Sequence, residues 1–224
     1  MSIFREIVNL WKSEDLLSQA WDESYKMMML SNEMFTQAIK YLREGENDET
    51  IRMLKKRDVE INTFQRDVRK KVVTHYAISQ DIEDLPNGLV LLNMVVDVER
   101  LGDYTKNILD LALNHPNIIK SEEFSEDLYH VEQEVISRFS KTLEAIHTQD
   151  SDVARSMMVS YKETLTSLSD DIVNGCISGE ITLGDESKTV SLALYARYLK
   201  RIGAHLKNIT TVLINPFDAV GYKK

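Results

Sequence analysis

The stretch Asp97–Ile108 reads DVERLGDYTKNI, and it is the part of the sequence that decides the fold. A related stretch, KRIGAHLKNI, occupies residues 200–209, which places Arg201 at a shift of 201 − 100 = 101 residues from Arg100. The positions that are identical at this shift are Arg100/Arg201, Gly102/Gly203, Lys106/Lys207, Asn107/Asn208 and Ile108/Ile209. A repeat of this length indicates a duplicated helical bundle and not the short period of a solenoid.

The composition is typical of a soluble protein made of long helices. Glycine and proline are scarce, with 8 and 3 residues among 224, and the formal net charge of −9 argues against binding to a nucleic-acid backbone. Cys176 is the only cysteine, so a disulfide within the chain is impossible and a reducing cytosol is the expected compartment. Residues 1–11 lack the apolar region of a signal peptide, and no apolar run approaches the ~20 residues of a membrane span.

Apolar residues recur at three- and four-residue spacing along the chain, which predicts helices and no strands. After an amphipathic lead-in at residues 1–15, we expect helices over about 16–43, 49–79, 86–115, 122–148, 153–177 and 187–213. Asp48 is the expected cap of the second helix. The predicted fold is therefore all-α, with six long helices in two tandem three-helix bundles that comprise residues 1–117 and 118–224. Short loops imply antiparallel neighbours within each bundle.

Two pairs of oxygen-bearing side chains form a candidate metal site. Glu99 and Asp103 lie four residues apart, which places them on one face of a helix, and Asp58 and Asn62 share this spacing on the preceding helix. The apolar stripe from which Glu99 and Asp103 point away is Val98, Leu101, Ile108 and Ala112. Carboxylate and amide oxygens suit Mg²⁺, Mn²⁺, Ca²⁺ or iron better than zinc. The alternative is that these acids belong to an ordinary solvated surface.

Other repeated residues indicate a structural role. Arg100 and Arg201, like Asn107 and Asn208, persist in both copies while the acids do not, so we expect them to hold helices together. The glycines inside the third helix of each half, Gly102 and Gly203, each cost about 1 kcal/mol relative to alanine. Both copies tolerate that cost, which predicts a close approach of another helix.

A second metal reading rests on Glu144-Ala-Ile-His147, which matches the Glu-x-x-His unit of ferritin-like di-iron bundles. Such sites need two of these units, and the nearest second candidate, Asp127-Leu-Tyr-His130, has the wrong acid and lies on the same helix. No arrangement of a nucleophile with a base and no phosphate-binding loop is present in the sequence. We therefore expect a protein that is not an enzyme.

The two related stretches resemble the PhoU family of phosphate-uptake regulators. The third helices of that family carry Glu-Arg-Ile-Gly-Asp-x-x-x-Asn-Ile, typically after Ala-Arg-Tyr-Leu. Glu99–Ile108 matches this pattern in the first half, and Ala196–Ile209 matches it in the second, in a resemblance that extends from about Leu16 to Leu213. It implies two tandem three-helix bundles, metal clusters on paired acidic motifs and frequent homodimers. It also implies a cytoplasmic role at the inner face of the membrane, beside the ATPase of a phosphate ABC transporter or a phosphate-sensing histidine kinase.

The resemblance assigns metal ligands to the first bundle only. The positions that match the family's ligands there are Asp58, Asn62, Glu99 and Asp103. The corresponding positions of the second bundle hold Tyr161, Leu165, Lys200 and Ala204. Because an ammonium repels a cation, we predict one metal site per chain and a second bundle held by packing, with Lys200 paired to a nearby acid. The residues after the last helix, Asn215–Tyr222, form an expected docked extension.

The expected function is that of a non-enzymatic, metal-binding regulator of phosphate transport and of phosphate-dependent signalling, which contacts a transporter ATPase or a sensor kinase. Two alternatives stay open at this point. One is a ferritin-like di-iron protein that uses Glu144 and His147. The other is a helical adaptor without a metal.

Overall fold

The computed structural model describes residues 16–79, 83–115, 126–148, 151–160, 165–215 and 217–221. The predicted lead-in at residues 1–15 lies outside these ranges, and so does most of the connection between the two halves. All regular structure within the described ranges is helical, which confirms the all-α prediction. The division between residues 117 and 118 falls in the undescribed connection and stays a prediction.

The first half forms one bundle. Its helices are α2 (Leu16–Glu44), α3 (Asp48–Lys56), α4 (Asp58–Ser79) and α5 (Leu85–Asn114). α2 packs against α4 and α5, and α4 packs against α5. The predicted second helix is divided at Arg57, where α3 ends. The predicted cap was wrong by one residue: the side chain of Asn47 accepts a hydrogen bond from the backbone N–H of Thr50, and Asp48 is the first helical residue.

The second half repeats this arrangement. Its helices are α6 (Glu126–Thr148), α7 (Ser151–Ser160), α8 (Ser167–Ser178) and α9 (Glu186–Thr211). The predicted helix over residues 153–177 is thus described as two segments, α7 and α8, with residues 161–164 between them not described. Asp185 is the N-cap of α9: its side chain accepts hydrogen bonds from the backbone N–H groups of Ser187 and Lys188.

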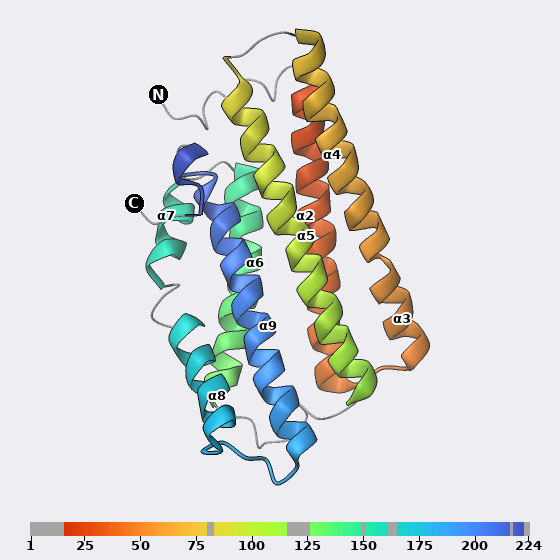
Figure 1. Ribbon diagram of the computed structural model, residues 1–224, viewed down its shortest axis with the longest axis vertical. Coiled ribbons are helices and arrows are strands. Elements are labelled where there is room, and N and C mark those ends of the chain that lie inside the picture. Colours follow the sequence, from red (N-terminus) through yellow and green to blue (C-terminus); the bar gives the residue numbers. More distant parts are fainter. Residues whose placement is uncertain are drawn as a thin grey trace.

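The two bundles lie side by side, and α5 and α9 run next to each other between them (Figure 1). α2 also contacts α6. The predicted stripes of the two third helices are buried, and Val98, Leu101, Leu199 and Ile202 are all 0% exposed. The buried apolar residues of both halves form one continuous core. The duplicated halves are therefore packed together and do not form two separate cores.

The repeated glycines mark close helix approaches, as the sequence predicted. A Cβ on Gly102 would lie 2.9 Å from Cδ1 of Ile61 and 3.3 Å from Oδ1 of Asp58, which are both on α4. A Cβ on Gly203 would lie 2.0 Å from Cδ2 of Leu165, just before α8. In each half the absence of a side chain on the glycine allows the residues of the second helix to approach the third helix closely. In the first half this close approach places the carboxylate of Asp58 against α5.

A buried polar contact joins three helices and both halves. Glu132 of α6 is only 4% exposed, and its carboxylate accepts hydrogen bonds from the phenol of Tyr195 on α9 and from Nε of Arg43 on α2, the latter at 3.1 Å. Complete burial raises the pKa of Tyr195 well above its ordinary value, and the Glu132 carboxylate raises it further. The phenol therefore remains a hydrogen-bond donor.

The C-terminal residues dock on the last helix, as predicted for the part of Asn215–Tyr222 that is described. The short 3-10 helix η3 (Phe217–Ala219) contacts α5. The backbone N–H of Gly221 donates to Oγ1 of Thr211 at 2.6 Å, and Nζ of Lys207 donates to the Gly221 carbonyl at 3.3 Å. These bonds tie Gly221 to α9.

We predict that Tyr195→Phe lowers the free energy of unfolding by about 2 kcal/mol, because it removes a donor from a buried carboxylate. Urea denaturation measures this change. Tyr129→Phe is the matched control, since Tyr129 is 55% exposed and the loss of its hydroxyl should change stability by less than ~0.5 kcal/mol. Equal effects of the two substitutions would contradict the role given to the Tyr195–Glu132 hydrogen bond.

Candidate functional site

The structure brings the predicted acids of the first bundle into one neighbourhood. Asp58 is the first residue of α4 and is 8% exposed. It faces α5 at the level of Gly102. Glu99 precedes this glycine in the sequence and Asp103 follows it. We call Asp58, Glu99 and Asp103 the acidic cluster.

A lysine holds the cluster together. Nζ of Lys106 lies 2.8 Å from Oδ2 of Asp58 and 2.9 Å from Oδ1 of Asp103, so one ammonium bridges α4 and α5. On the solvent side, Nη1 of Arg100 lies 2.9 Å from Oδ2 of Asp103, and its Nε lies 3.6 Å from Oε2 of Glu99. Two cations of the chain itself therefore neutralise part of the cluster.

The cluster nevertheless keeps an excess of negative charge. Burial raises the pKa of Glu99, the carboxylates of Asp103 and Asp58 raise it further, and Arg100 opposes them. Burial alone would lower the pKa of Lys106, but its hydrogen bonds to Asp58 and Asp103 outweigh burial and raise it. Oδ1 of Asp58 is buried and has no hydrogen-bond partner among the described residues. A carboxylate oxygen in that state would gain from a further cation or donor.

The donors fit a hard cation in type, but they are arranged around an ammonium. Asn62 donates its amide N–H to Oδ2 of Asp58 at 2.9 Å, so it serves as a hydrogen-bond donor in this arrangement. Within the described ranges, no three Asp, Glu, His or Cys side chains converge closely enough to hold a metal ion. The metal site predicted at Asp58, Asn62, Glu99 and Asp103 stays a prediction.

The second bundle carries a lysine–aspartate pair in the corresponding region. Nζ of Lys200 lies 2.6 Å from each carboxylate oxygen of Asp170 on α8, as the prediction of a nearby acid required. Leu165 packs against Gly203, and Ala204 supplies no ligand. Tyr161 lies outside the described residues.

A polar contact between the bundles begins one residue after Asp103. The ring of Tyr104 stacks on His205 of α9 with ring centroids 5.8 Å apart. Nε of Arg201 donates to the Tyr104 hydroxyl at 3.1 Å, and its guanidinium lies 5.7 Å from the centre of that ring. Two turns earlier on α5, Oδ1 of Asp97 lies 2.7 Å from Nδ1 of His205. The acidic cluster is thus adjacent to the contact between the two halves.

The structural role predicted for the repeated arginines and asparagines holds in the second copy. Arg201 contacts Tyr104, and Nδ2 of Asn208 donates to Asp97 at 3.1 Å, so both join α9 to α5. For the first copy the prediction was wrong in one case, because Arg100 pairs with acids of its own helix. Asn107 lines a polar groove beside the cluster and has no hydrogen bond to another described side chain.

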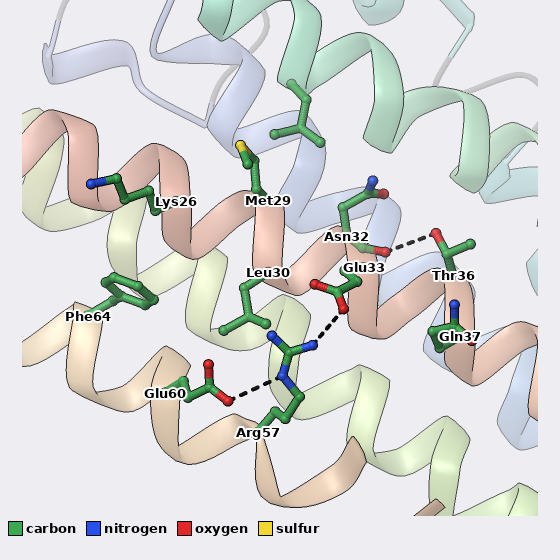
Figure 2. A pocket seen from close by; sticks show the side chains of 11 residues that line it. Lys26, Met29, Leu30, Asn32, Glu33, Thr36, Gln37, Arg57, Glu60 and Phe64 are labelled. Carbon is green, nitrogen blue, oxygen red and sulfur yellow. Dashed lines mark hydrogen bonds and ion pairs between the residues drawn. The ribbon is translucent and has the colours of Figure 1, made fainter. Parts of the chain in front are cut away.

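An open groove between α2 and α4 surrounds the break at Arg57 (Figure 2). Nη1 of Arg57 lies 2.6 Å from Oε1 of Glu33 on α2, and its Nε lies 3.2 Å from Oε1 of Glu60. Leu30 and Phe64 supply apolar surface in the groove. The guanidinium therefore joins α2 to the start of α4 and is already paired with carboxylates.

The di-iron alternative gains no support from the described residues. Glu144 and His147 are exposed on α6, and the His147 ring stacks on Tyr25 of α2 with centroids 5.5 Å apart. Asp127 and His130 are exposed near the start of the same helix. Among the described residues, neither motif is part of a group of three or more His, Cys, Asp or Glu side chains that could hold a metal ion.

The PhoU domain matches the chain twice, at residues 25–112 and 128–213, once over each bundle. The chain belongs to the PhoU family. It is 25% identical over 201 residues to the phosphate-specific transport system accessory protein PhoU homolog of Clostridium acetobutylicum, an alignment that covers 88% of this chain and 90% of that protein.

Two solved PhoU structures share the fold. The crystal structure of PhoU from Pseudomonas aeruginosa superposes with a TM-score of 0.74 at 21% identity, covering 89% of this chain and 95% of that one. The phosphate transport system regulatory protein PhoU from Streptococcus pneumoniae gives a TM-score of 0.70 at 18% identity, over 88% and 93% of the two chains. These likenesses confirm the all-helical architecture of two PhoU repeats.

Proposed function

We propose that this PhoU-family protein regulates phosphate transport and phosphate-dependent signalling. The observation that carries the proposal is the double match to the PhoU domain, which covers both bundles. The name of the relative from Clostridium acetobutylicum, an accessory protein of a phosphate-specific transport system, supports the same role.

The protein acts, in this proposal, by contact with partners and not by catalysis. The partners are the ATPase of a phosphate ABC transporter, a phosphate-sensing histidine kinase, or both, and the protein reaches the inner face of the membrane through them from the cytoplasm. In the described part of the chain, no helix combines the length and the apolar character needed to cross a membrane. Attachment through partners is compatible with that finding.

A homodimer completes the proposed assembly. Several large apolar side chains on the outer faces of the helices are more than half exposed, among them Val59, Val73 and Ile78, and they offer surface for pairing. Light scattering at micromolar concentration tests this state. A mass near the 25.8 kDa of a single chain would contradict it.

The first bundle, we further propose, takes up a divalent or iron-type cation (Mg²⁺, Mn²⁺, Fe or Ca²⁺) at Asp58, Glu99 and Asp103, with Asn62. The buried, unpartnered Oδ1 of Asp58 and the raised pKa of Glu99 support this, because both indicate negative charge that is incompletely compensated. When bound, the ion would supply that compensation and join α4 to α5. The second bundle would take none, since Lys200 already pairs with Asp170.

Deletion of the gene tests the regulatory proposal. We expect phosphate import, or the expression of phosphate-starvation genes, to lose its normal response to external phosphate, because the contact that transmits the signal is gone. The measurements are uptake of labelled phosphate and a starvation-responsive reporter, with the wild-type gene restored as the control. Unchanged behaviour in both measurements would contradict the proposal.

Metal analysis tests the proposed site separately. We expect the variant Glu99→Ala/Asp103→Ala to lose the bound metal, because two of the three carboxylates are removed. Lys200→Ala, at the corresponding position of the second bundle, is the control and should keep the metal content of the wild type. Full metal content in the double variant would show that the cluster is not the site.

A further inference from the structure

We propose that Lys106 is the resident counter-ion of the acidic cluster, and that a divalent cation enters only by displacing its ammonium. The site would then work by exchange of lysine for metal. This inference rests on the metal proposed above, but it assigns a role to a residue that is not among the predicted ligands.

The positions of the ammonium and of a metal ion exclude each other. Nζ of Lys106 is in hydrogen-bond contact with one oxygen of Asp58 and one of Asp103, at 2.8 and 2.9 Å. A divalent cation would approach the same carboxylates to about 2.0–2.6 Å. Two positive charges held by the same oxygens would lie only a few ångströms apart and repel each other. Lys106 must leave before the metal is held.

The charge balance explains why a metal can replace the lysine. The three carboxylates of the cluster carry −3, and Lys106 with Arg100 supplies +2, which leaves −1. Replacing the ammonium by a divalent ion while Arg100 stays gives −3 + 2 + 1 = 0. Exchange therefore removes the excess charge on the buried side of the cluster, where Oδ1 of Asp58 has no partner among the described residues.

The displaced lysine has a place to go. Lys106 lines a polar groove beside the cluster that also contains Lys55, Asn107 and Asp110. Asp110 follows Lys106 by four residues on α5, so its carboxylate lies one helical turn away on the same face. Asp110 now pairs with Lys55, and its side chain is 44% exposed. A rotation of the Lys106 side chain along α5 would move the ammonium from Asp103 to Asp110.

The duplicated sequence provides a matched control. Lys207 occupies the position of Lys106 in the second copy, but Ala204 stands where Asp103 stands. Its ammonium donates to the backbone carbonyl of Gly221 and not to a cluster of acids. Removing Lys207 deletes the same charge at the same helical position without opening a cation site.

The first test measures Mn²⁺ affinity of the full chain by isothermal titration calorimetry. We expect Lys106→Met to bind roughly tenfold more tightly than the wild type, or better, because a charge-assisted hydrogen bond no longer has to be broken. Lys106→Arg, which keeps the charge, and Lys207→Met should bind like the wild type. Adding Glu99→Ala/Asp103→Ala to Lys106→Met should abolish the gain.

The second test uses the wild-type chain, so it does not depend on whether a variant folds. Amine acylation followed by mass spectrometry reports the accessibility of Lys106, whose side chain is 25% exposed when it is paired. We expect Mn²⁺ to increase the acylation rate of Lys106 several-fold and to leave that of Lys207 unchanged. Mg²⁺ at saturating concentration should do the same.

The results separate the two proposals. Tighter binding by Lys106→Met together with metal-induced acylation supports exchange. Mn²⁺ binding by the wild type that Lys106→Met does not tighten, or a Lys106 that Mn²⁺ fails to expose, overturns exchange and leaves the metal site standing. If neither chain binds Mn²⁺, the exchange and the metal site are both wrong. The regulatory role is tested independently by the gene deletion.

Discussion

A carboxylate that is buried between helices loses its hydration and must accept a hydrogen bond or ion pair from a residue of another helix. This constraint organises the molecule. An unpaired buried charge would cost several kcal/mol. The contacts that meet the constraint are Glu132 with Arg43 and Tyr195, Asp97 with His205 and Asn208, and Asp58 with Lys106. Asp170 pairs with Lys200 in the same way, although its side chain is 42% exposed. The first two join the halves, and the last two join the second and third helices within each half. Apolar packing supplies the core, and these pairs fix which helix faces which.

The placement of the acidic cluster follows from the same contacts. Asp103 pairs with Lys106 inside the first bundle, and the next residue, Tyr104, packs on His205 and Arg201 of the second. A change in which cation holds Asp103 would therefore act on the helix that also forms the contact between the bundles. The chain therefore offers a continuous physical connection between the acidic cluster and the contact between its two halves.

Much of the fold could be predicted from the sequence, because the deciding signals are local. Apolar spacing predicted the helices, and the glycines repeated at a shift of 101 residues predicted close approaches that the structure confirms. The break at Arg57 could not be predicted, since the apolar stripe continues through it, and the side chain of Arg57 pairs there with Glu33 of another helix. Glu132 and Tyr195, which are 63 residues apart, carry no signal in sequence spacing. The sequence shows Lys106 as a repeated residue, but its pairing with Asp58 depends on how α4 packs on α5.

The divergence of the two copies gives the lysines different roles. In both halves an aspartate on the second helix pairs with a lysine on the third, but from different positions along that helix. In the second half, Lys200 replaces an acid and meets both oxygens of Asp170, with alanine at the position of the remaining acid, so the charges balance. In the first half the third helix keeps both acids, so the ammonium of Lys106, which pairs with Asp58 and Asp103, lies near three carboxylates. The cluster of the first half therefore keeps an excess of negative charge that the lysine–aspartate pair of the second half lacks.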